Sequence, residues 1–277
     1  MLNSSSVRVY VCTAATLLTL TLLAAPASAQ YRPRIASDPA TGEKYHIEVG
    51  AGFWFPKAEI SVTSEGLGIA GTTIDAKKDL GLSDQRFPEL QVVLRPSRSQ
   101  KLRLQYIPIK YDQTGTPTRT ITFNGQKYLL NVPVNSTLDW KAYRFAYEYD
   151  FVVRDRGFVG FLIEAKYTDV GVTLASPFVA AQFVRARAPI PALGGIGRVY
   201  VTPNISITAD ITGFKLPTVE DRYAGHYVDV DIYGTVNVTN YVGAQVGFRS
   251  FDVGYLVKKD TGSMTLKGLY FGGVVRY

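Results

Sequence analysis

The chain has 277 residues, a formal net charge of +7, 46% hydrophobic and 12% aromatic residues, and a single cysteine. Its lysines and arginines are scattered rather than clustered, so we expect no nucleic-acid partner; the charge instead favours anionic lipid headgroups. Beyond residue 30 no apolar stretch approaches the ~20 residues of a membrane-spanning helix, which argues against a helical membrane protein.

The first 29 residues predict a cleaved signal peptide. Arg8 supplies a positive charge, residues 9–23 form a short apolar core, and residues 27–29 (Ala-Ser-Ala) form a small-x-small cleavage site. A membrane anchor is the alternative, but the apolar run is short for a span. Cys12 would leave with the signal. An exported chain without disulfides needs a large core or a closed hydrogen-bonded barrel.

Residues 30–42 are polar and contain proline, so we expect a loose periplasmic leader. No composition break or linker follows, and residues 43–277 are therefore expected to form one domain.

Ten segments of this domain alternate between apolar and polar or small residues. Because a β-strand repeats every two residues, each segment would have one apolar and one polar face. In residues 138–153, for example, Tyr143 and Phe145 alternate with Arg144 and Ala146. The ten strands are expected near residues 44–56, 87–95, 101–111, 138–153, 158–168, 190–201, 205–213, 227–238, 241–250 and 264–277.

The connections between these strands alternate in length. Long ones, at 57–86, 112–137, 169–189, 214–226 and 251–263, are separated by short turns at 96–100, 154–157, 202–204 and 239–240. Outer-membrane barrels have short periplasmic turns and longer extracellular loops, whereas a soluble sandwich has no reason to sort its loops. We predict an all-β fold, a transmembrane antiparallel up-and-down β-barrel with ten strands, eight being the alternative.

Asn124-Gly125 lies between two short β-like runs, 120–123 and 127–130. This dipeptide favours a two-residue hairpin turn. It predicts a small hairpin above the barrel or an extension of its strands.

The last strand carries the motif Leu269-x-Phe271-x-Gly273-x-Val275-x-Tyr277. With the signal peptide and the alternating strands, it resembles the small outer-membrane β-barrel proteins of the OmpA/OmpW-like superfamily. The resemblance implies an outer-membrane location in a Gram-negative bacterium. It also implies that Phe271, Val275 and Tyr277 belong to a C-terminal signal for the barrel-insertion machinery. The typical barrel of that group has eight strands, whereas this sequence predicts ten.

The predicted inward faces carry charges of both signs, which would pair across strands in a narrow lumen. A barrel of about eight strands is filled by side chains, whereas ~16 strands leave a water-filled pore. Ten strands favour a filled interior over a channel lining, and a monomer is expected. The predicted interior charge network comprises Glu48, Arg103, Arg144, Glu148, Glu164, Lys166, Asp229, Asp231 and Arg249.

A catalytic site would need a cluster of proton-transferring groups, and the best candidate is Asp221, His226, Asp229 and Asp231. No serine elbow motif accompanies it, and a polar rim of the barrel explains the same residues. The sequence therefore predicts a non-enzymatic protein without cofactor or metal, with a structural or surface-interaction role among outer-membrane lipids. The alternatives are a narrow porin for small solutes and a hydrolase using the His226 region.

Overall fold

The computed structural model describes residues 40–65, 68–220 and 222–277. The predicted signal peptide, 1–29, and residues 30–39 of the predicted leader lie outside the described residues. Residues 40–42 contact the barrel: the Thr41 amide donates to the Pro203 carbonyl, and the Gly42 amide donates to Asn240 Oδ1 at 2.9 Å.

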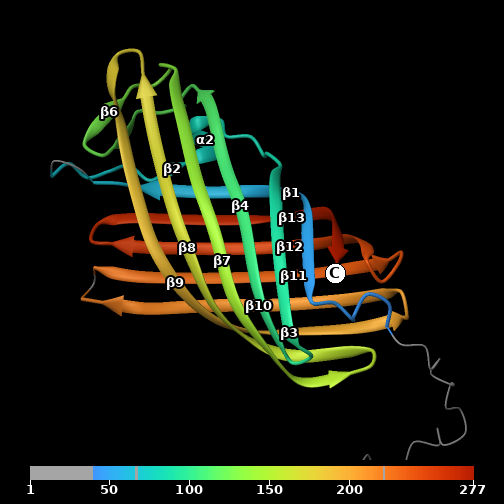
Figure 1. The fold of residues 1–277 in the computed structure, drawn as a ribbon. Coiled ribbons are helices and arrows are strands. Elements are labelled where there is room, and N and C mark those ends of the chain that lie inside the picture. Colours follow the sequence, from blue (N-terminus) through green and yellow to red (C-terminus); the bar gives the residue numbers. More distant parts are fainter. Residues whose placement is uncertain (1–39, 66–67, 221) are drawn as a thin grey trace, which may run out of the picture. The chain divides into compact units, whose positions relative to one another are not determined.

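Ten strands form a closed antiparallel barrel, which confirms the predicted fold and strand number (Figure 1). Each strand pairs with the next one along the chain, and the last pairs with the first. The barrel strands are β1 (Ile47–Thr63), β3 (Phe87–Ser97), β4 (Gln100–Gly115), β7 (Val134–Arg154), β8 (Gly157–Ser176), β9 (Val179–Thr202), β10 (Ile205–Val219), β11 (Tyr223–Asn237), β12 (Val242–Val257) and β13 (Asp260–Arg276).

Two small elements lie at the end of the barrel where β1 finishes, which we call the outer end (Figure 1). The first is β2 (Ile74–Asp75), which pairs with β1 and leads into the short helix α2 (Ala76–Leu80). The second is the hairpin of β5 (Ile121–Phe123) and β6 (Gln126–Tyr128). Its turn residues Asn124 and Gly125 have φ of 48° and 79°, as the predicted two-residue turn requires.

Three of the predicted long loops are wrong, because the strands continue into them. The predicted loops 169–189, 214–226 and 251–263 are the outer parts of three strand pairs, which turn at 177–178, 220–222 and 258–259. The connections between β1 and β3 and between β4 and β7 remain long at the outer end. A strand needs about 9–11 residues to cross a bilayer, so β9, with 24 residues, extends well beyond one.

The side-chain pattern inverts along the strands, which explains the missed extensions. In the inner part of β7, Phe145 points outward and is 53% exposed, while Arg144 is buried. Further out on the same strand, Trp140 is buried and Lys141 is exposed. The apolar face thus changes from the outside of the barrel to its inside. The missed extensions show the same inversion: Leu174 of β8 and Phe251 of β12 are buried, so an apolar outer face no longer marks the strands there.

The first predicted strand also begins differently from the prediction. The alternation of residues 44–56 puts Tyr45 on the outward face with Phe53 and His46 on the inward face, yet Tyr45 is buried and His46 is exposed. The amides of His46 and Ile47 both donate to the Tyr277 carbonyl, so the regular alternation of β1 starts only after this irregularity. Among the described residues, no helix is long and apolar enough to cross a membrane.

Candidate functional site

The barrel interior is the candidate site, and Asp229 is at the centre of its charged layer. The carboxylate accepts from Arg249 at two positions, Nε to Oδ1 at 3.0 Å and Nη2 to Oδ2 at 2.6 Å. Lys166 Nζ lies 2.9 Å from Oδ2, and the Tyr227 hydroxyl donates to the same oxygen at 2.9 Å. All four side chains are buried. Their contacts with Asp229 therefore connect strands β8, β11 and β12 at a position shielded from bulk water.

A second carboxylate, Glu164, extends this layer toward β7. Arg144 Nε donates to Glu164, and Lys166 Nζ lies 2.7 Å from its Oε1. Arg144 also reaches Asp210 of β10 at 3.6 Å. Because Lys166 contacts both Glu164 and Asp229, the ion pairs form a continuous network rather than separate bridges. In a low-dielectric interior such bonds polarise and strengthen one another.

A further group of charges lies nearer the inner end, where the C-terminus, the start of β1 and the short turns of the barrel are found. Lys101 Nζ contacts Glu148 at 2.6 Å and Asp150 at 2.8 Å, and Arg103 donates to Glu148. Lys101 also lies 3.4 Å from the ring centre of Phe158. Lys101 is not among the predicted interior charges, although it shares its parity with Arg103.

The inner rim is closed by residues of both chain ends. Glu48 of β1 accepts from Arg276 of β13, and Arg276 also donates to Asn237 at 2.7 Å. Glu43, which precedes β1, contacts Arg95 at 3.3 Å and Arg198 at 3.2 Å. Burial alone would raise the pKa of the Glu43 carboxyl, but Arg198 and Arg95 outweigh burial and hold this pKa below its ordinary value.

The structure places all nine residues of the predicted interior network inside the barrel. Eight of them take part in ion pairs: Glu48, Arg103, Arg144, Glu148, Glu164, Lys166, Asp229 and Arg249. The ninth, Asp231, lies in register between Asp210 of β10 and Arg249 of β12. The predicted insertion-signal residues Phe271, Val275 and Tyr277 lie on the outer face of the C-terminal segment, 53%, 60% and 85% exposed.

Above the charged layer the interior becomes aromatic and aliphatic. Trp140 packs on Phe251 with ring centres 4.9 Å apart, and Tyr227 meets the same ring at 5.1 Å. Trp54 and Tyr111 are also fully buried in this cluster. These large aromatic side chains therefore pack against one another inside the outer part of the barrel.

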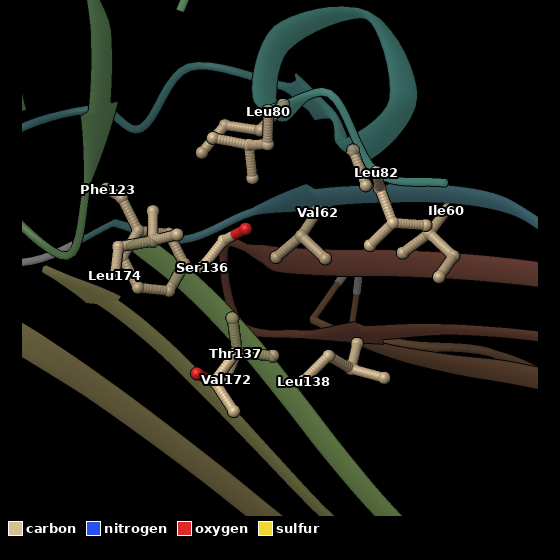
Figure 2. Close-up of a pocket in the computed structure, with 12 residues that line it drawn as sticks. Ile60, Val62, Leu80, Leu82, Phe123, Ser136, Thr137, Leu138, Val172 and Leu174 are labelled. Atoms are coloured by element: carbon tan, nitrogen blue, oxygen red, sulfur yellow. The ribbon is translucent and has the colours of Figure 1, made fainter. Parts of the chain in front are cut away.

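The segment around α2 and the β5–β6 hairpin, which we call the lid, covers the outer end. Leu80 and Leu82 point toward Val62 of β1 and Leu138 of β7 across a cavity of about 40 Å³ (Figure 2). Arg119 fixes the lid by donating to both oxygens of Asp79 at 2.9 and 2.8 Å. These hydrogen bonds hold the pKa of the Asp79 carboxyl below its ordinary value.

A larger free volume lies at the inner end of the barrel. A cavity of about 480 Å³ opens there, lined by residues that include Glu43, Arg95 and Tyr277. Between the charged and aromatic layers the cavity bordered by Trp54, Lys166 and other side chains measures about 30 Å³. That volume is of the order of one water molecule.

The predicted cluster around His226 does not assemble. Asp229 and Asp231 point into the barrel. His226 lies three residues before Asp229 on the same strand, so it faces the opposite side and is exposed. His226 Nε2 instead lies 3.1 Å from Asp252 Oδ2. Asp221, the fourth member, lies outside the described residues. Residues at odd separations on one strand face opposite sides, which a list of nearby polar residues ignores.

The ion pair between Arg144 and Glu164 can be tested by a double-mutant cycle. We expect Arg144→Ala and Glu164→Ala to be less harmful together than the sum of the two, with an interaction energy of about 0.5–3 kcal/mol, because each single change leaves a buried charge without its partner. Urea unfolding of the refolded protein in lipid vesicles measures it. The control cycle combines Arg144→Ala with Glu148→Ala, which have different ion-pair partners. Additive effects in the first cycle would mean independently hydrated charges.

A closed antiparallel sheet with apolar side chains outside and charges inside is the architecture of a membrane β-barrel. No protein-family model matches the chain, and no curated protein matches it. Among solved structures, the chain is similar to the outer-membrane protease OmpT from Escherichia coli, with a TM-score of 0.56 and 7% identity over 87% of this chain and 99% of that one. This likeness shows the fold: the chain is a β-barrel of the outer-membrane type.

Two more distant structures are also similar. The attachment invasion locus protein Ail of Yersinia pestis has a TM-score of 0.35 and 9% identity over 82% of this chain and 97% of that one. The toluene transporter TodX of Pseudomonas putida has a TM-score of 0.31 and 8% identity over 87% of this chain and 92% of that one.

Proposed function

We propose that this protein is an integral outer-membrane β-barrel whose interior is closed to solutes and whose role is structural or in surface interaction. The observation that supports the proposal is the packing of ion pairs and aromatic side chains inside the barrel. Cavities within the charged and aromatic layers and under the lid measure only about 30 and 40 Å³. To cross the barrel, a hydrated solute would need a continuous path through the charged layer, the aromatic layer and the lid.

The membrane placement is supported by the outer surface. Large apolar side chains are exposed on all ten barrel strands, at positions where water would disfavour them. In lipid the same positions are favourable, and the closed ladder leaves no unpaired strand edge. These residues include Phe53, Leu90, Leu104, Phe145, Ile163, Val199, Ile211, Ile232, Val246 and Leu269.

The rival function, a narrow porin, requires the interior network to open. Separating a buried ion pair so that one charge loses its partner costs about 3–5 kcal/mol. Asp229 and Glu164 are each bound by two cations. A pore along the axis would have to break several of these contacts together, which favours the closed barrel.

A catalytic role finds less support than a structural one. OmpT is a protease by name, but at 7% identity the likeness extends to the fold only. The His226–Asp252 pair lies on the outer face of the barrel, with side chains 49% and 40% exposed, and no serine elbow motif accompanies it in the sequence. His226→Ala in an activity screen on peptide and lipid substrates tests the hydrolase alternative.

Single-channel recording in planar bilayers tests the closed interior. We expect no stepwise conductance from the refolded protein, because aromatic side chains and ion pairs fill the interior. Trp54→Ala combined with Trp140→Ala removes two of the largest buried side chains but leaves the ion pairs in place, so this variant is also expected to stay closed. Discrete conductance steps from the unaltered protein would support the porin instead. A detergent-independent, water-soluble monomer would overturn the membrane placement itself.

A further inference from the structure

Basic side chains mark the outer limit of the apolar surface on most strands. On β1 the outward residues are apolar through Phe55, and the next outward residue is Lys57. The same order is found on β7, where Lys141 follows Tyr143, and on β13, where Lys267 follows Leu269. The complete set, which we call the basic collar, is Lys57, Arg86, Lys110, Lys141, Arg187, Lys215, His226 and Lys267, all exposed.

The collar lies at the level expected for lipid headgroups. Tyr106, Tyr143 and Tyr167 are aligned across β4, β7 and β8, with ring centres 4.8 and 6.4 Å apart in turn. Such tyrosines occur at the boundary between hydrocarbon and headgroups. Lys141 is the next outward residue beyond this row. Long lysine side chains at this depth extend their ammonium groups into the polar layer.

The two ends of the barrel differ in this respect. At the inner end the outward rows finish on apolar residues such as Ile47, Ile205 and Val242. Basic residues there, Lys44, Arg98 and Arg154 among them, lie before β1, in the β3–β4 turn and at the end of β7 rather than around the barrel. A headgroup that distinguishes the ends is therefore negatively charged and belongs to the outer side.

Within the collar, the cations of β1 and β13 form the most concentrated group. Lys57 and Lys267 are directly opposed in the strand register. Directly opposed Cβ atoms on antiparallel strands lie about 4.5–5.5 Å apart, and like charges in this position repel. Neither ammonium forms an ion pair among the described residues; Glu59 is the next outward side chain on β1. Arg86 lies close by, over the Phe53 ring at 5.3 Å.

Other collar cations already face acids. Lys141 is opposed to Asp169, which is also bound by Arg185 and Arg187, and Lys110 is opposed to Asp139. The repulsion between Lys57 and Lys267 is relieved only in part, because the acid that attracts Lys57, Asp84, is already bound by Lys77 at 2.7 Å and by the Ala58 amide at 2.9 Å. A doubly charged oxyanion between the two ammonium groups would remove it, and lysine binds phosphate well as a point charge.

We propose that Lys57 and Lys267, with Arg86 beside them, bind the phosphate of a lipid headgroup in the leaflet at the outer end. The inference rests on the proposed membrane location. The site is formed by three neighbouring strands, β13, β1 and the segment entering β3, so a bound lipid also covers the seam where the first and last strands meet. Its acyl chains would pack on Phe55 and Leu269 directly below.

Native mass spectrometry of the protein in nanodiscs can measure this binding, with lipid A as the phosphate-bearing probe in phosphatidylcholine. Each basic residue near an anionic surface contributes about a fivefold change in affinity. We therefore expect Lys57→Gln with Lys267→Gln to weaken lipid A retention about 25-fold. The control is Lys258→Gln with Lys259→Gln, two lysines in the turn of the same β12–β13 pair, with retention expected to stay within about twofold of the parent.

Removing the phosphates from lipid A should abolish the preference for the parent protein. Heat-modifiable gel migration confirms that each variant is folded, and the double glutamine variant should fold at least as well in pure phosphatidylcholine, because the like-charge repulsion is gone. Equal retention by parent and variant, equal loss in the control, or unchanged binding of the dephosphorylated lipid would each overturn the site. Failure of the parent to insert into any bilayer would instead overturn the proposed membrane location.

Discussion

Replacing Asp229 with alanine is expected to lower the free energy of unfolding by about 3–5 kcal/mol. The change removes the carboxylate that receives Arg249 and Lys166, and both cations stay buried beside an apolar methyl group. A buried charge without a partner is far more costly than the ion pair is favourable, so the loss exceeds that of an exposed bridge.

The measurement is equilibrium unfolding in urea, with the protein refolded in lipid vesicles. The only two tryptophans, Trp54 and Trp140, lie in the interior layer above Asp229 and report directly on its opening. Asp155→Ala in the exposed β7–β8 turn is the matched control, expected to change stability by less than about 0.5 kcal/mol. A loss below about 1 kcal/mol for Asp229→Ala would contradict the dry network. The interior would then be hydrated, and the porin alternative would gain support.

Strand parity allowed the interior charges to be predicted from the sequence. Residues two or four positions apart on a regular strand share a face. The inward faces of Arg144 and Glu148 on β7, and of Glu164 and Lys166 on β8, follow from this rule. The same argument failed at Tyr45, where two successive amides share one carbonyl acceptor and shift the alternation. A local pattern cannot reveal a shift that arises from pairing with the far end of the chain.

The lid and the aromatic layer could not be predicted in this way. Leu80, Phe123 and Leu174 are distant in sequence and meet only because the barrel brings the loop and hairpin over one opening. Trp140 is buried in the outer part of β7, where the polar face of the strand is the outer one. The inverted pattern is visible in the sequence, yet assigning it requires knowing which end of the strand lies outside the bilayer.

The outward position of Phe145 leads to the second large expected effect. Val246→Arg is expected to destabilise the protein by about 2–4 kcal/mol in a bilayer, because a guanidinium would face hydrocarbon near its midplane. Phe145→Arg, one outward position below the Tyr143 row, is expected to cost about 1–3 kcal/mol, because the cost falls toward the interface. Phe145 on β7 is 53% exposed, and Val246 on β12 is 47% exposed. These two strands are not neighbours in the sheet.

Two controls separate depth from orientation, and both are measured by denaturant unfolding in phospholipid vesicles. Gln245→Ser changes the inward neighbour of Val246, whose amide contacts the Thr235 hydroxyl at 3.3 Å, and is expected to cost about 1 kcal/mol. Thr265→Arg places the same cation on the outer face of β13, beyond Lys267, where the cost should fall to about 0–1 kcal/mol. Ala146 is a poor control, because it packs on Phe158 and Leu162 inside the barrel. If arginine proved as costly at Thr265 as at Phe145, the rows of outward apolar residues would not mark the membrane. The basic collar could then not be placed at the level of the lipid headgroups.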